Sequence, residues 1–180
     1  RSCSDGAENG LWETWYENGQ LKHEGTFLNG KMHEKWTGWY KNGKKSYEVT
    51  YNQGVNDGPA LYWYENGNAK LEKHYQDTVL HGEFKAWQEN GKQTVSGTYV
   101  NGKKNGKWLY FDLMNPELLI REEFYKDGKP DGIWITRYKY GSVESIKNFK
   151  NGKKNGLIKY MKPDGEVVYE AIFKDDTLIK

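Results

Sequence analysis

The sequence predicts an all-β fold, an elongated and twisted antiparallel meander of about seven tandem β-hairpins. Two observations carry this prediction. A turn dipeptide, usually Asn-Gly or Asp-Gly, precedes an aromatic segment seven times, at a spacing of 24 residues except for one step of 26. The second half of each copy alternates apolar and polar residues, which is typical of a strand with one buried face. The copies begin near residues 10, 34, 58, 82, 106, 132 and 156.

Each copy is predicted to contain two strands and two turns. Positions are counted from the first residue of a copy, taken as zero, with the two extra residues of the fifth copy left out. The first strand is a short aromatic segment such as residues 11–16, and Asn18-Gly19 then forms a turn, because Asn-Gly accepts positive φ at little cost. The second strand ends on an aromatic residue at position 17, and a turn such as Asn29-Gly30 closes the copy. The residues at position 17 are Phe27, Tyr51, Tyr75, Tyr99, Tyr125, Phe149 and Phe173.

The composition predicts a core made of aromatic rings. Residues of the hydrophobic class are 36% of the chain, yet aromatic residues alone are 16%. Each such ring buries roughly 150–250 Å², so rings at positions 2, 5 and 17 are expected to fold over the sheet and cover it. The tryptophans lie at position 2 (Trp12, Trp36, Trp108, Trp134) or position 5 (Trp15, Trp39, Trp63, Trp87).

The charge balance gives no indication of a nucleic-acid partner. The formal net charge is only +2. Residues 1–90 carry 10 basic and 13 acidic groups, whereas residues 91–180 carry 17 and 12. The chain is therefore expected to be mildly dipolar along its length and to bind no nucleic acid.

The N-terminal residues leave two interpretations open. Residues 1–8 are predicted to be a disordered or linker-like tail, and residues 9–180 a single repeat array. Cys3 is the one cysteine, so no disulfide can form within the chain. A cysteine at the head of a polar segment resembles the start of a mature bacterial lipoprotein, although Arg1 departs from the usual apolar lipobox. Cys3 is thus either a lipid anchor in the cell envelope or an inert cysteine in a cytoplasmic protein.

The repeat resembles the MORN family in its bacterial MORN-2 variant. That motif reads close to G-x-W-x-x-Y-Y-x-N-G-x-L-x-x-E-x-x-Y-x-N-G-K-x-x-G, and residues 10–33 follow it best. The resemblance covers roughly residues 9–180 and implies the hairpin fold. It also implies relatedness to bacterial antitoxins of the YwqK type, which are thought to neutralise a partner toxin. The matching residues of the first copy are Trp12, Trp15, Tyr16, Asn18, Gly19, Leu21, Glu24, Phe27, Asn29, Gly30 and Lys31.

We therefore expect a non-enzymatic protein-binding module, most simply an immunity protein or antitoxin that blocks a cognate partner sterically. The alternative is an envelope lipoprotein or scaffold anchored through Cys3 that contacts lipid, glycan or other proteins. No catalytic, cofactor or metal site is expected. The glutamates at position 14 are interpreted as a solvated, cross-strand-paired face, and the histidines as polar turn residues. These residues are Glu24, Glu48, Glu72, Glu122 and Glu170, with His33 and His81 before turns.

Specificity is expected where the copies differ. Tyr62 and Tyr110 stand at position 4, where other copies have Thr14, Gly38 or Ala86, and are predicted to be exposed. The fifth copy carries two extra residues in 112–117, so Leu113, Met114 and Glu117 are further candidates for partner binding. Lysines at the turns of one edge form a candidate patch for anionic surfaces, and the terminal edge strands could pair two copies into a homodimer. The patch comprises Lys103, Lys104, Lys107, Lys150, Lys153 and Lys154.

Overall fold

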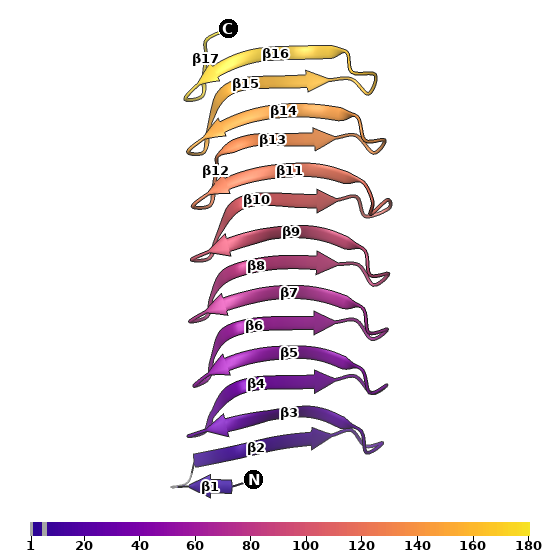
Figure 1. Ribbon diagram of the computed structural model, residues 1–180, viewed down its shortest axis with the longest axis vertical. Coiled ribbons are helices and arrows are strands. Elements are labelled where there is room, and N and C mark those ends of the chain that lie inside the picture. The colour runs from indigo at the N-terminus through magenta and orange to yellow at the C-terminus, as the bar shows by residue number, and fades with distance from the viewer. Residues whose placement is uncertain (1, 5–6) are drawn as a thin grey trace. The chain divides into compact units, whose positions relative to one another are not determined.

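The computed structural model describes residues 2–4 and 7–180, with side chains from residue 8 onward. All regular secondary structure in these residues is β-strand, which confirms the all-β prediction. The chain divides into two units, residues 1–91 and 92–180. Within each unit, consecutive strands pair antiparallel as a meander (Figure 1).

The first unit contains β1 to β8, and each of β1 to β7 pairs with the strand that follows it in the chain. The strands are β1 Ser2–Ser4, β2 Ala7–Trp15, β3 Leu21–Leu28, β4 Lys31–Trp39, β5 Lys45–Asn52, β6 Val55–Trp63, β7 Ala69–Gln76 and β8 Val79–Trp87.

The second unit contains β9 to β17 and repeats the same pairing, with β11 contacting both β12 and β13. The strands are β9 Gln93–Val100, β10 Lys103–Phe111, β11 Leu119–Lys126, β12 Lys129–Pro130, β13 Gly132–Arg137, β14 Val143–Lys150, β15 Lys153–Met161, β16 Val167–Lys174 and β17 Thr177–Leu178.

The turns form where the sequence places them. Asn29 and Gly30 have φ of 52° and 74°, so both central residues adopt the left-handed conformation that a tight hairpin turn requires. At the other end of the hairpin, Gly19 has φ of 83° and the Asn18 side chain accepts a hydrogen bond from the Gln20 amide at 3.1 Å. Local turn chemistry therefore sets both ends of the hairpin.

The N-terminal predictions mostly concern residues outside this description. The backbone of Cys3 pairs with that of Glu8 between β1 and β2. Residues 1, 5 and 6, and the side chains of residues 1–7, lie outside the described part of the chain. The linker-like tail at residues 1–8, the lipid anchor at Cys3 and the single array over 9–180 therefore stay predictions.

A bulge in the second strand of the hairpin decides which rings share a face. Thr14 pairs with His23 but Trp15 pairs with Leu21, so Lys22 is an extra residue on β3, while β2 alternates without interruption. Positions 2, 4, 13, 15 and 17 therefore share one face, named here the core face. Positions 3, 5 and 14 lie on the opposite face. The prediction that rings at positions 2, 5 and 17 cover one face together is wrong for position 5.

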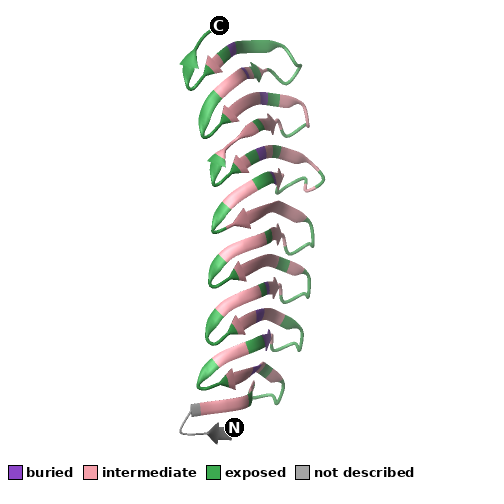
Figure 2. Cartoon of the chain, turned by 60° about the vertical axis from the view of Figure 1, so that its left-hand side comes forward, coloured by how far each residue is buried: buried purple, intermediate pink, exposed green. Residues whose placement is uncertain are grey.

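The core face is packed by residues at positions 2 and 15 that complement one another in size. A Cβ built on Gly25 would lie 2.2 Å from the indole of Trp36, so this position is compatible only with glycine while the ring stays in place. Gly97 has the same relation to Trp108. Buried residues are few and are scattered along the strands (Figure 2). The buried apolar residues are Trp36, Val49, Ala60, Trp108, Ile158 and Ala171.

Candidate functional site

The insertion in the second unit forms an ordered loop between β10 and β11 with an apolar tip. The Asp112 carboxylate accepts hydrogen bonds from the amides of Met114 at 2.9 Å and Asn115 at 2.7 Å. The Asp112 amide donates to the Leu118 carbonyl at 2.9 Å, which closes the loop. Leu113 is 63% exposed and Met114 is 95% exposed. The loop thus holds two apolar side chains in water.

A cavity of about 410 Å³ lies beside this loop. Its wall includes Tyr110, Leu113 and Ile120, together with Arg121 and Thr136. Two of the predicted partner-binding residues, Tyr110 and Leu113, therefore line one site. Met114 and Glu117 do not line the cavity.

Glu117 is engaged at the far end of the loop. Its carboxylate accepts a hydrogen bond from the Lys92 ammonium. This hydrogen bond, followed by the positive charge of Lys92, lowers the pKa of Glu117. Both groups are exposed, so the pair fixes the loop only weakly.

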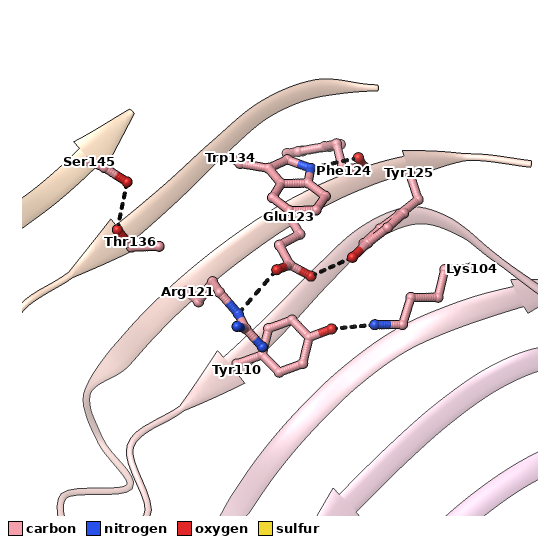
Figure 3. Close-up of polar contacts among 9 residues, drawn as sticks. All are labelled: Lys104, Tyr110, Arg121, Glu123, Phe124, Tyr125, Trp134, Thr136 and Ser145. Atoms are coloured by element: carbon pink, nitrogen blue, oxygen red, sulfur yellow. Dashed lines mark hydrogen bonds and ion pairs between the residues drawn. The ribbon is translucent and has the colours of Figure 1, made fainter. Parts of the chain in front are cut away.

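Tyr110 belongs to a polar network on the core face (Figure 3). Lys104 Nζ donates to its hydroxyl at 2.6 Å, and the Arg121 guanidinium lies 4.1 Å from the centre of its ring. Glu123 is only 4% exposed; its carboxylate accepts from the Tyr125 hydroxyl at 2.8 Å and pairs with Arg121 Nε at 3.1 Å. The network forms a rigid wall next to the cavity.

Burial raises the pKa of both phenols of this network. Burial first, and then the negative charge of Glu123, raises the pKa of Tyr110 above its ordinary value. Burial and the hydrogen bond to Glu123 raise the pKa of Tyr125 in the same direction. Burial lowers the pKa of Lys104. Both hydroxyls therefore remain hydrogen-bond donors at neutral pH.

Tyr62 lies in the first unit and does not join this site. The sequence predicts that Tyr62 and Tyr110 are exposed, but both are half-buried, because position 4 lies on the core face. Tyr62 pairs across strands with Tyr47, and the ammonium of Lys73 lies 5.4 Å from its ring centre. Its size is thus explained by packing on the core face.

The predicted lysine patch is only partly available. Lys104 is half-buried in the network above, and Lys107 pairs with Glu122 at 2.7 Å. Lys154 Nζ lies 5.1 Å from the ring centre of Phe173. Lys103, Lys150 and Lys153 are exposed.

The position-14 glutamates form ion pairs on the opposite face. Glu48 pairs with Lys35 of β4 at 3.6 Å, and Glu170 pairs with Lys159 of β15 at 2.9 Å. Glu122 accepts from Arg137 at 2.6 Å as well as pairing with Lys107. Their interpretation as cross-strand-paired carboxylates is confirmed for these three copies.

The histidines occupy separate environments. His33 lies in strand β4 and His81 in strand β8, so their interpretation as turn residues is wrong. His33 Nδ1 accepts a hydrogen bond from the Gln53 amide at 3.4 Å. No group of three His, Cys, Asp or Glu side chains in the described residues could hold a metal ion. Likewise, the described chain has no helix long and apolar enough to cross a bilayer.

His23 gives the first unit a pH-dependent stability. Its ring stacks on Trp12 at 6.5 Å between centres, and burial, followed by the charge of Lys22, lowers the pKa of His23 below 6.5. The unfolded chain binds the proton more readily, so the stability is present above pH 6.5 and is lost as the pH falls below it. We expect His23→Gln to flatten this acid loss in thermal melts between pH 7.5 and 5. An equal acid loss in the variant would contradict the assignment.

A ladder of tyrosine hydroxyls, which the sequence did not reveal, connects consecutive hairpins. In the first unit the donors are Tyr16, Tyr40 and Tyr64, at position 6. Each donates to the carbonyl of the next copy's position-5 residue, at 2.7, 2.7 and 2.9 Å to Trp39, Trp63 and Trp87. In the second unit Tyr138 donates to Met161 in the same way at 2.8 Å. The hydroxyl at these four steps fixes the spacing of the hairpins that it connects.

Comparison with known families agrees with this geometry. Residues 8–29, 30–53 and 56–77 match the model of the MORN repeat variant. These three matches cover less than half of the chain. No curated protein matches the chain. The matched segments cover the hairpins β2–β3 and β4–β5 and most of β6–β7, all in the first unit. The second unit has the same strand pairing and the same bulges, so it continues the MORN-like hairpin pattern as a repeat module.

Proposed function

We propose that this protein is a non-catalytic, protein-binding repeat module that neutralises a cognate partner, in the manner of an immunity protein or antitoxin, by covering the partner's active surface. The observation that carries the proposal is the apolar tip of the 112–117 loop beside the 410 Å³ cavity. The repeated hairpins form the scaffold, and the 112–117 loop of the fifth copy contacts the partner.

The loop has the properties of an interface anchor. Met114 and Leu113 are exposed although they are apolar, and Asp112 fixes the backbone that carries them. Exposed apolar groups on a pre-ordered loop bind with little loss of conformational entropy. The cavity beside them offers a hollow with an aromatic wall, where a partner side chain would be removed from water.

The charge of the second unit indicates the sign of the partner's surface. Residues 92–180 contain 17 Lys and Arg against 12 Asp and Glu. Complementary charge raises the association rate and excludes partners of like charge. The partner surface is therefore acidic around an apolar centre, and inhibition is steric.

The test uses the purified product of the gene adjacent to this one. We expect a stable complex in size-exclusion chromatography, and loss of the partner's toxicity when the two are co-expressed. Met114→Glu and Leu113→Glu place a charge in the contact, so we expect each to weaken the complex by about tenfold or more, as for an interface hot spot.

Tyr140→Ala is the matched control, because Tyr140 is 80% exposed on another loop of the same unit. It should bind like the unmodified protein. Absence of a complex, or equal binding by the Met114→Glu and Leu113→Glu variants, overturns the proposed function at this site.

A further inference from the structure

Four tryptophans form a regular row on the opposite face of the first unit. Trp15, Trp39, Trp63 and Trp87 are the last residues of β2, β4, β6 and β8. The ends of these strands follow one another along the same edge of the unit (Figure 1). Because neighbouring strands lie about 4.7–4.9 Å apart, alternate strands place successive tryptophans about 9.4–9.8 Å apart.

The tyrosine ladder holds this row in register. Each of Trp39, Trp63 and Trp87 receives, on its backbone carbonyl, the hydroxyl of the preceding copy's tyrosine. The spacing is therefore fixed by hydrogen bonds between hairpins before any ligand binds. A pre-organised surface loses less conformational entropy on binding than a flexible one.

The rings are accessible, unlike the position-2 tryptophans of the core face. Trp15 is 55% exposed and the other three are half-buried, whereas Trp36 is only 3% exposed. A cavity of about 250 Å³ contacts both Trp63 and Trp87, with Leu61 and Ala69 in its wall. The row thus combines aromatic surfaces with a hollow between two of them.

We propose that this row binds a proline-rich segment of a partner protein in the polyproline II conformation. That helix has three residues per turn and rises about 3.1 Å per residue, so it repeats every 9.3 Å or so. A proline at every third residue then meets a tryptophan at each step of the row. Ten residues span about 28 Å, which matches the roughly 29 Å of three hairpin steps.

The carboxylates near Trp15 favour a basic residue at the end of the segment that contacts this ring. Glu13 and Glu24 are directly opposite each other on β2 and β3, and like charges in this arrangement are destabilising. Both lie on the face that carries Trp15, which can stack on a cation. Glu72 lines the cavity at the other end of the row. Residues 1–91 contain 13 acidic against 10 basic groups, so a basic ligand is complementary.

This site goes beyond the proposed function, because it uses the first unit and a different class of ligand. It needs neither the 112–117 loop nor a toxin. Failure of either proposal leaves the other intact.

The experiment titrates the full chain with a capped ten-residue peptide, Arg-Ala-Pro-Pro-Ala-Pro-Pro-Ala-Pro-Pro, which places prolines three residues apart in phase with the arginine, by calorimetry and by indole N–H chemical shifts. The comparison ligands are an arginine-headed Gly-Ser peptide of equal length and the glycan cellohexaose. We expect binding of the proline peptide alone, with shifts at Trp15, Trp39, Trp63 and Trp87. Binding of cellohexaose without the peptide, or of both peptides equally, overturns the proposal.

Variants then test the row itself. Trp15→Ala changes the most exposed ring and should weaken binding about tenfold, as expected for an aromatic hot spot. Trp63→Ala should do the same, with circular dichroism to confirm folding. Replacing Glu13 and Glu24 together by glutamine should weaken binding about two- to fivefold, the effect of exposed ion pairs. Tyr140→Ala is the exposed aromatic control, and an equal loss there overturns the assignment.

Discussion

Trp108→Ala is expected to lower the free energy of unfolding of the second unit by about 3–5 kcal/mol, the usual loss for a buried tryptophan. Trp108 is 2% exposed and packs against Tyr99 at 5.0 Å between ring centres. Its Nε1 donates to the Thr98 carbonyl at 3.2 Å. The indole lies over Gly97, which has no side chain that could move into the space. The cavity left by the substitution therefore stays open.

Urea unfolding followed by circular dichroism measures this loss. Trp15→Ala is the matched control, because it removes a tryptophan that is 55% exposed and makes no such packing contact with glycine. We expect it to cost less than about 1 kcal/mol, as for a surface substitution. Similar losses for the two variants would show that positions 2 and 5 do not differ in burial, contrary to the face assignment.

Sequence reasoning predicted the hairpins because their signals are local. Asn29-Gly30 and Asn18-Gly19 each contain the turn chemistry within two residues, and both adopt the positive φ that this chemistry permits. The pattern needs no knowledge of distant contacts. Repetition then carries the same local solution along the chain, which is why the fold was predicted correctly.

The assignment of faces could not be obtained in the same way. Alternation with a period of two predicts which face of the sheet a side chain lies on only while strand pairing is continuous. The extra residue Lys22 interrupts this alternation on β3. A bulge depends on the register between two strands, which the sequence of one strand does not contain. Hence the rings at position 5 were wrongly expected beside those at position 2.

The candidate site shows the same division. Leu113 and Met114 were predicted because the two-residue insertion in the fifth copy is visible as a change in the repeat length. Glu123 was missed because a charged residue in a polar sequence resembles any surface residue. Its position gave no consistent signal, because position 15 is small or apolar in four other copies (Gly25, Val49, Gly97, Ala171) but is Lys73 and Lys147 in the remaining two.

Glu123→Ala is the second substitution with a large expected effect. It removes the acceptor of the Tyr125 hydroxyl and the partner of Arg121, inside a network that is almost closed to water. Breaking a buried pair costs about 3–5 kcal/mol, and we expect roughly 3 because Arg121, with a side chain 45% exposed, can still reach solvent. Urea unfolding of the variant measures this loss in the free energy of unfolding.

The chain offers its own control for this network. Arg121→Tyr combined with Glu123→Val reproduces Tyr47 and Val49, the residues at positions 13 and 15 of the second copy. An apolar pair needs no charge compensation, so the double variant should regain most of the stability lost in Glu123→Ala. Such recovery would mean that the network is not required for stability. Its contribution would then be to hold Tyr110 in the wall of the cavity. We then expect the double variant to fold well and yet to bind the partner less tightly at the 112–117 loop. Unchanged binding by the double variant would show that the network does not contribute to partner binding at this site.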